Sequence, residues 1–344
     1  MSHLPSSGKN AQAEIIREIR ALLPPDAFQP NPRRLLGMGF ILVVLFSAHA
    51  AVALTGASGW ILGPIVVAAL ALASLALATH ELAHGAVLRP GRLQRWCEVI
   101  FWTPLLISPT VWRRVHTQAH HAHTNTPRDP DRRYFHDEAS TVMRWYVRIF
   151  YPNAELFPWN PLVFLHVGPY MARNTLSAFL PAKWQLPMVP SRVDYQPGDA
   201  GRIAFELGVM AAFQVGFFHL TGGEWLPYLI MAAGSQALTS AISMGYIFTN
   251  HFNNPLSVEV NQIRGSTSVI VPKWADYLHY NFSYHTEHHV FPTLNSDYYP
   301  LVSRHLQRLC PGVYQRIPIA QAWQRLWRNA PFIAKPGAPA STAG

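Results

Sequence analysis

Four segments of the chain are long and apolar enough to cross a lipid bilayer. They cover residues 35–54, 60–79, 203–220 and 225–249, and turns of four or five residues join them into two pairs. No Lys or Arg occurs from residue 35 to residue 80, or from residue 203 to residue 251. A transmembrane helix needs roughly 20 predominantly apolar residues. We therefore expect an all-α integral membrane protein with four transmembrane helices in two hairpins.

Composition and charge agree with this expectation. Charged residues make up 13% of the chain, against about 25% in an average soluble domain. The formal net charge is +9, but the cations lie outside the paired apolar segments, which is the positive-inside pattern of membrane proteins and does not indicate nucleic-acid binding. It places both termini and the middle of the chain on the cytosolic side of a cytoplasmic membrane. The alternative is a soluble bundle that buries two helical hairpins.

The pattern divides the chain into three parts. Residues 1–34 form a cytosolic N-terminal segment without the apolar core of a signal peptide. Residues 35–331 form the membrane domain, and residues 332–344 are expected to be a disordered tail. Within the membrane domain, residues 93–112 are interrupted by two prolines and predict an amphipathic element at the membrane surface. Two distant cysteines exclude a disulfide framework and a rubredoxin module.

Histidines gather in three short clusters beside the apolar segments. Neutral imidazole is the commonest protein ligand for metals, and so many imidazoles without CxxC motifs favour two irons over a structural zinc. The expected ligands are His80 and His84 in THELAHG, His116, His120 and His121 in VHTQAHH, and His285, His288 and His289 in HTEHH. The sequence thus predicts a di-iron site in a cytosolic helical cap at the mouth of the bundle.

Helical geometry gives an expectation for each cluster. If residues 116–121 form an α-helix, His116 and His120 share a face and His121 lies about 100° around the axis, which suits ligation of two different ions. In the third cluster the three histidines share one helical face, with Asn281 one turn earlier on it.

Neighbouring polar residues are candidates for orienting the ligands. Asp129 and Asp131 could hold imidazoles in place, or could belong to a solvated turn. Glu287 points away from the ligand face and could support a ligand from behind. His123 is a further possible ligand, a hydrogen-bond donor to one, or a solvated residue.

The three clusters, in this order and around two apolar pairs, resemble the histidine boxes of the membrane fatty acid desaturase/hydroxylase superfamily over roughly residues 35–310. The stretch NFSYHTEHHVFP is especially similar to the third box. The resemblance implies that the boxes bind two iron ions, with O2 as co-substrate. It also implies a further ligand near the fourth apolar segment, which would be His251 in GYIFTNHFNNP. Asn250 and Asn281 would be water-mediated neighbours of the irons.

The resemblance implies oxidation of an unactivated C–H bond in a membrane-embedded acyl chain, with a fatty acyl or lipid desaturase as the principal interpretation. No HPGG haem motif of a cytochrome b5 domain is present, so electrons would come from a separate ferredoxin, rubredoxin or cytochrome b5-like protein. HHAHTNTPRDPD also resembles the second box of carotenoid ketolases. A hydroxylase, a ketolase and a terminal-alkene-forming acyl decarboxylase stay open on this scaffold. A membrane zinc hydrolase or metal transporter is the alternative outside it.

Overall fold

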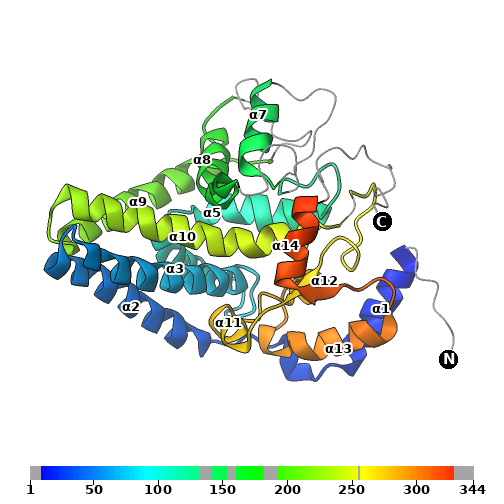
Figure 1. Ribbon diagram of the computed structural model, residues 1–344. Coiled ribbons are helices and arrows are strands. Elements are labelled where there is room, and N and C mark those ends of the chain that lie inside the picture. Colours follow the sequence, from blue (N-terminus) through cyan, green and yellow to red (C-terminus); the bar gives the residue numbers. More distant parts are fainter. Residues whose placement is uncertain (1–8, 132–140, 153–159, 182–192, 255, 329–344) are drawn as a thin grey trace.

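The computed structural model describes residues 9–131, 141–152, 160–181, 193–254 and 256–328, and these are mostly helical (Figure 1). Four long helices form its framework. They are α2 (Arg34–Thr55), α3 (Leu62–Ala83), α9 (Asp199–Leu220) and α10 (Trp225–His251), and the short 3-10 helix η2 (Gly59–Ile61) precedes α3. Helix α3 lies between α2 and α10 and packs against both, and α9 contacts α2 and α10.

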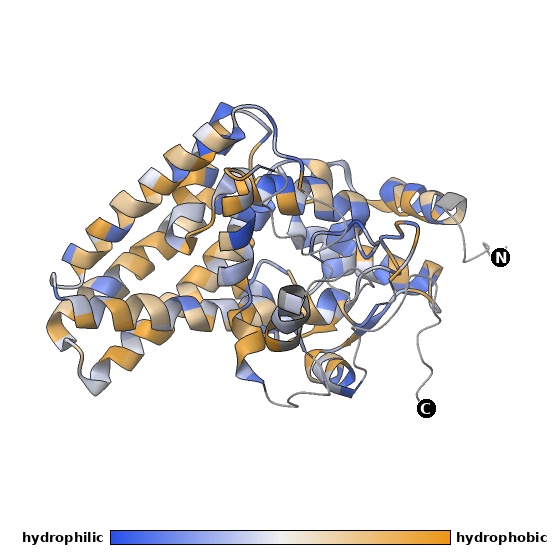
Figure 2. Cartoon of the chain, turned by 90° about the horizontal axis from the view of Figure 1, so that it is seen from above, coloured by the Kyte–Doolittle hydropathy of each residue, from blue (hydrophilic) through white to orange (hydrophobic). Residues whose placement is uncertain are grey.

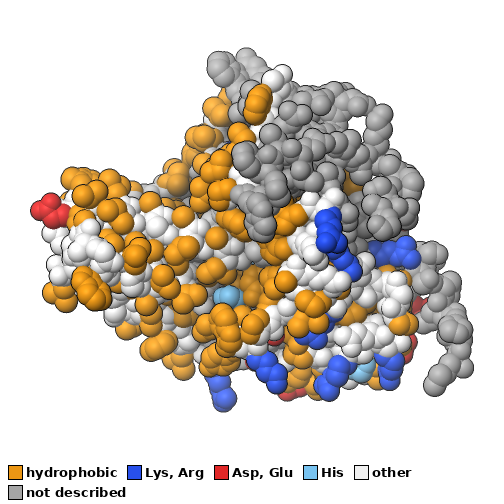
Figure 3. Space-filling view, viewed as in Figure 1, with side chains coloured by type: hydrophobic (Ala, Val, Ile, Leu, Met, Phe, Trp, Pro, Cys, Tyr) orange, Lys and Arg blue, Asp and Glu red, His pale blue; other side chains and the backbone are white. Residues whose placement is uncertain are grey.

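Three of these long helices are apolar and long enough to cross a membrane: α2, η2 with α3, and α9. Large apolar side chains on their outer faces are exposed, including Leu36 and Phe40 of α2 and Val215 of α9. Figures 2 and 3 show that hydrophobic residues cover the end of the molecule formed by the long helices, and Figure 3 shows Lys and Arg away from that end on the face in view. This distribution is the one that a membrane protein requires.

Helix α10 forms as the sequence predicts but is not among the described helices that are apolar and long enough to cross a membrane. Its polar side chains are used between helices, because Thr239 donates a hydrogen bond to the Ala69 carbonyl (3.2 Å) and Gln236 donates to the Pro104 carbonyl (2.8 Å). A Cβ atom on Gly234 would lie 3.1 Å from Ile65 Cγ2 of α3, so the two helices approach closely. The fourth membrane span, the pairing of spans as hairpins and their orientation in a membrane stay predictions.

The chain between α3 and α9 carries helices of the cap. Helix α4 (Arg92–Trp102) exposes Leu93 and Trp96 while it buries Gln94 and Glu98, and it ends at η3 (Thr103–Leu105), which contains Pro104. It is amphipathic as expected, and its place at a membrane surface stays a prediction. The following elements are α5 (Pro109–Trp112), η4 (Arg113–His120), α6 (His121–His123), α7 (Thr141–Phe150), η5 (Pro161–Leu165) and α8 (Val167–Ser177).

The C-terminal part completes the cap. Strands β1 (Ser268–Ile270) and β2 (Arg316–Pro318) pair in parallel, which is a small departure from an all-α fold. The helices of this part are α11 (Lys273–Leu278), α12 (His285–Val290), η7 (Ser296–Tyr298), α13 (Tyr299–Leu309) and α14 (Ile319–Arg328).

The N-terminal segment packs onto this C-terminal part. Helix α1 (Lys9–Leu22) and η1 (Pro25–Phe28) contact it, with Ile15 and Ile19 in one apolar cluster with Val302 and Leu306 of α13. The division at residue 34 and the cytosolic location of this segment stay predictions. The predicted disordered tail, residues 332–344, lies outside the described residues.

Candidate metal centre

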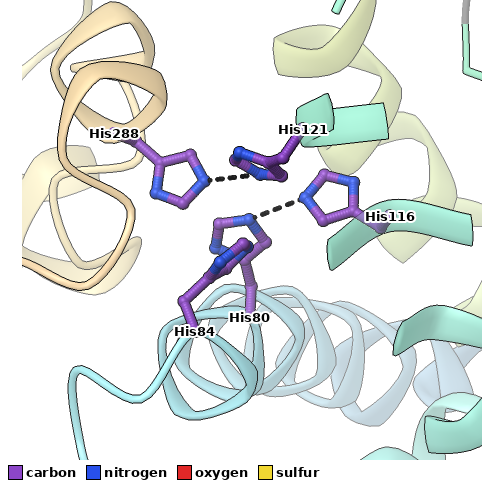
Figure 4. Close-up of side chains that lie close together, drawn as sticks. All are labelled: His80, His84, His116, His121 and His288. Atoms are coloured by element: carbon purple, nitrogen blue, oxygen red, sulfur yellow. Dashed lines mark hydrogen bonds between the residues drawn. The ribbon is translucent and has the colours of Figure 1, made fainter. Parts of the chain in front are cut away.

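Buried imidazoles converge in two adjacent groups. The ring nitrogens of the first group lie within 4.8 Å of one another, and those of the second do so as well. Figure 4 shows the first group, whose rings point towards a common centre from three parts of the chain. The first group consists of His80, His84, His116, His121 and His288, and the second consists of His120, His251 and His289.

His285 adjoins the second group. Its Nε2 lies 2.8 Å from His251 Nε2 and 3.1 Å from His289 Nε2. All nine histidines named as metal ligands from the sequence are therefore brought together. His123 is in neither group and is only partly buried.

The second cluster differs from the α-helical expectation. Residues Arg113–His120 form a π-helix, in which hydrogen bonds join residues five apart. In an α-helix such residues would lie about 140° apart around the axis, whereas here His116 and His121 belong to the same group and His120 to the other. His116 and His120 nevertheless stack on each other with ring centroids 5.0 Å apart and, with Asp131, form a third set of possible metal ligands, as their expected common face implies. What the α-helical expectation did not include is the position of His121 beside His116. The π-helix is the reason.

Two ion pairs and one hydrogen bond hold the α5–η4 segment against its neighbours. Arg113 bonds Glu98 of α4 at 2.5 Å, and Arg114 Nε bonds Asp199 of α9 at 2.7 Å. Glu206 of α9 accepts a hydrogen bond from Thr110 Oγ1 (2.6 Å) at the start of α5. Since α9 belongs to the framework and α4 packs against α3, these contacts set the position of the three histidines on η4 and α6.

The two aspartates of the second cluster contact ligand rings directly. Asp129 is fully buried, and its Oδ1 lies 2.8 Å from His120 Nδ1. Asp131 Oδ2 lies 3.2 Å from His116 Nδ1, and Tyr170 donates to the other oxygen of Asp131. A carboxylate on Nδ1 fixes the tautomer whose Nε2 lone pair is free for a metal. The alternative of a solvated turn does not describe Asp129.

The remaining polar candidates lie farther from the rings. Glu287 is buried and accepts hydrogen bonds from Ser268 (2.5 Å) and Tyr314, so it fixes α12 rather than a ligand ring. Asn281 is not on the α12 face, because α12 begins only at His285. Asn281 has a φ of +57°, and its amide donates to the Ser296 carbonyl. The side chain of Asn250 is buried without a hydrogen-bond partner among the described residues.

Sequence reasoning missed four residues around the site. The hydroxyl of Tyr299 lies 3.1 Å from His288 Nδ1, and a carboxylate oxygen of Glu81 lies 3.5 Å from His80 Nδ1. The ring of Trp112 stacks on that of His116, with ring centroids 4.6 Å apart. Asn125 donates to the His251 carbonyl (3.1 Å) and the Gly265 carbonyl (2.6 Å), joining the second cluster to the end of α10. Of these four residues, only Glu81 could have been singled out from the sequence, because it directly follows His80.

Burial favours the neutral form of most of these imidazole rings. It lowers the pKa of His84, His121, His288 and His289 well below the ordinary value, and it lowers the pKa of His116 to about 4. Burial opposes the charged form of His120 as well, but Asp129 and Asp131 outweigh it and raise that pKa.

The donor set fits two metal ions. The Nε2 atoms of His84 and His120 are buried without a hydrogen-bond partner among the described residues, and several other Nε2 atoms face one another at 2.8–3.2 Å. Buried polar atoms of this kind are normally satisfied, and neutral imidazole suits iron, copper, nickel or zinc. Five imidazoles in one group exceed the four ligands of a typical structural zinc site.

An apolar cavity of about 90 Å³ opens onto both groups. Its polar end is lined by His80 and His116 of the first group, His120 and His251 of the second, and His285. The remaining lining is mainly apolar and includes Trp102, Ile107, Met171, Met244 and Phe248, with a few polar side chains among them. The site can therefore place an apolar segment beside both groups at once.

Comparison with known proteins confirms the resemblance seen in the sequence. The family model "Fatty acid desaturase" matches residues 28–319. The "sn-1 acyl-lipid omega-3 desaturase (ferredoxin)" of a Synechocystis strain is 24% identical over 336 residues, which covers 91% of this chain and 86% of that protein. The apolar helices and this match make the protein a membrane protein and a desaturase-like oxidoreductase. The chain belongs to the fatty acid desaturase family.

Proposed function

We propose that this protein is an O2-dependent di-iron desaturase that introduces a double bond into a fatty acyl chain of a membrane lipid. The observation that carries the proposal is the apolar cavity that reaches both groups of imidazoles. A cavity with apolar walls and a metal-ligating end suits a hydrocarbon and would reject a polar hydrolase substrate. The activity of the Synechocystis relative, an acyl-lipid desaturase by its name, supports the same substrate class.

The residues of the site have separable tasks in this proposal. The first group would hold one iron and the second group the other, with His285 in the second. When bound, the irons supply the oxidising power that O2 and two electrons generate for removal of two hydrogens from adjacent carbons. Asp129 and Asp131 keep the Nε2 atoms of His120 and His116 directed inwards. Trp102, Met244 and Phe248 exclude water and hold the chain at the histidine end of the cavity.

The electron donor and the orientation of the protein are part of the proposal. The donor would be a separate protein, and the name of the Synechocystis relative points to a ferredoxin as the first candidate. The Lys and Arg side chains that Figure 3 shows away from the apolar end suit an acidic partner. The active site and both termini would then lie on the cytosolic side.

The test is the lipid profile of a host that expresses this chain together with a ferredoxin and its reductase. We expect new unsaturated acyl chains, absent from a His288→Ala control, and about two irons per purified chain. Hydroxylated lipid, oxygenated carotenoid or terminal alkenes without new internal double bonds would assign a different reaction to the same site. Stoichiometric zinc with metal-dependent hydrolysis would refute the oxidase interpretation altogether.

A further inference from the structure

A second hollow lies on the other side of the segment that carries the histidines. It is an open groove of about 1160 Å³ between α4, the α5–η4 segment and the first half of α9, and it shares no lining residue with the apolar cavity. Five arginines line the groove, and we refer to it as the arginine groove. They are Arg92, Arg95, Arg113, Arg114 and Arg202.

The carboxylates of the groove are already engaged. Glu98 bonds Arg113 at 2.5 Å, and Asp199 bonds Arg114 at 2.7 Å. Glu206 accepts hydrogen bonds from the hydroxyls of Ser108 and Thr110. Glu98 and Asp199 therefore neutralise Arg113 and Arg114, the two inner arginines. The outer arginines keep an excess of positive charge, and they are Arg92, Arg95 and Arg202.

The outer arginines lack a partner of their own. Arg92 and Arg95 are exposed and, within the described part of the chain, have no carboxylate at ion-pair distance. Arg202 reaches Asp199 only at 3.4 Å, is 60% exposed, and shares that carboxylate with Arg114. Arg92 and Arg95 stand three residues apart on one face of α4, where like charges repel. An anion bound between them would remove this repulsion.

The groove also has an apolar side. Trp96 of α4 and Phe205 of α9 contact each other edge to face, with ring centroids 6.1 Å apart. Both rings are more than half exposed, at 57% and 53%. Phe205 belongs to a helix that is apolar and long enough to cross a membrane and begins at Asp199, so the arginines lie at the end of that helix. Aromatic rings and arginines together are characteristic of the boundary between lipid and water.

We propose that the arginine groove binds the phosphate headgroup of an anionic membrane lipid. The phosphate would sit between Arg92, Arg95 and Arg202, since a guanidinium binds phosphate through paired hydrogen bonds. The glycerol and the first methylenes would lie against Trp96 and Phe205. A free phosphate would use only the charged side of the groove, whereas a lipid uses both sides. The proposal concerns binding and holds whatever reaction the histidine site performs.

The test measures lipid retention on the full chain. Purified protein in detergent is titrated with phosphatidylglycerol or phosphatidylcholine, and bound lipid is counted by native mass spectrometry. We expect a preference for phosphatidylglycerol that falls at least about tenfold in Arg92→Ala/Arg95→Ala, since each arginine near a membrane surface contributes on the order of a severalfold change in affinity. The matched control is Arg304→Ala/Arg308→Ala, which removes the same charge from exposed positions on α13 and should keep the preference.

Two further arms separate a lipid from a soluble anion. Trp96→Ala should weaken phosphatidylglycerol binding and leave the affinity for inorganic phosphate, measured by calorimetry, unchanged. Metal-free protein should give the same results as iron-loaded protein. Equal retention of both lipids by the wild type, or equal losses in the groove variant and in the α13 control, would overturn the proposal. So would phosphate binding that Arg92→Ala/Arg95→Ala abolishes while phosphatidylglycerol binds no better than phosphatidylcholine.

Discussion

Replacing Asp129 with asparagine tests whether a carboxylate sets the tautomer of a ligand ring. Asp129 is fully buried and accepts three hydrogen bonds. Its Oδ1 accepts hydrogen bonds from His120 Nδ1 (2.8 Å) and from the backbone N–H of Asp131 (2.9 Å). Its Oδ2 accepts one from the backbone N–H of Asn125 (2.7 Å). An asparagine has only one oxygen. If that oxygen faces His120, the new side-chain NH2 group faces the backbone N–H of Asn125, so that two donors oppose each other. If it faces Asn125, the NH2 group donates to His120 Nδ1 and forces the proton onto Nε2.

The magnitude follows from these two arrangements. The first leaves a buried N–H without an acceptor, at a cost of about 1–3 kcal/mol. The second removes one lone pair from the second group of imidazoles. Loss of a partner behind a ligand typically lowers metal affinity about 10- to 100-fold, which is about 1.4–2.8 kcal/mol. We therefore expect Asp129→Asn to weaken the second iron by that factor and to leave the first group nearly unaffected.

The assay is stepwise removal of iron by a chelator, followed by metal analysis of the protein. One of the two irons should leave Asp129→Asn at a chelator concentration at least about tenfold lower than in the wild type. Asp297→Asn is the matched control, because it makes the same chemical change in an exposed carboxylate (60% exposed) that pairs with Arg34. Retention of both irons at wild-type affinity in Asp129→Asn would refute the proposed role of this carboxylate.

Three further predictions address packing and protonation. Asp199→Asn removes the partner of Arg114 and should lower the free energy of unfolding by about 1–3 kcal/mol; an unchanged melting temperature would show that this pair does not hold η4. Gly234→Val should destabilise the protein by about 1–3 kcal/mol through collision with Ile65, whereas Gly208→Val on α9, where a Cβ meets nothing within 4 Å, should not. Burial lowers the pKa of His279 to about 4 from an ordinary 6.5, so the unfolded chain binds a proton that the folded chain does not between these pH values. The contribution of His279 to stability should therefore fall by up to about 3 kcal/mol as the pH drops from 6.5 to 4, and thermal melting of His279→Gln should show a total fall that is smaller by this amount; an identical pH profile would contradict this.

The framework was largely predictable because its signals are local. Apolar length and the absence of cations placed the four long helices within a few residues of their observed bounds, with the second extended from Thr79 to Ala83 and the third begun earlier, at Asp199. What the sequence could not separate was a helix facing lipid from one facing other helices. Helix α10 has both kinds of surface, since Leu226 and Leu229 are exposed while Thr239 and Gln236 donate hydrogen bonds to α3 and to the chain after α4.

That these nine histidines converge was predictable from their type and spacing, but their grouping was not. Placing His121 with His116 requires the π-helix, and the residues of RRVHTQAH do not indicate one, because the helix type is seen only in the folded chain. The contacts of Tyr299 and Asn125 could not be predicted either, because their partners lie 11 and 126 residues away in the sequence. Asn281 failed differently, since the helix that would have carried it begins four residues later, at His285.

The distribution of the ligand rings along the chain has a consequence for biosynthesis. Each group draws on α12 for at least one ring, His288 in the first and His289 in the second, while His80 and His84 come from the first quarter of the sequence. Neither group can close until residues 285–290 have emerged from the ribosome and docked on the finished helices. Loading of the proposed metals would therefore follow translation and depend on a complete chain, and a truncated product would leave its early histidines as an incomplete set of lower affinity.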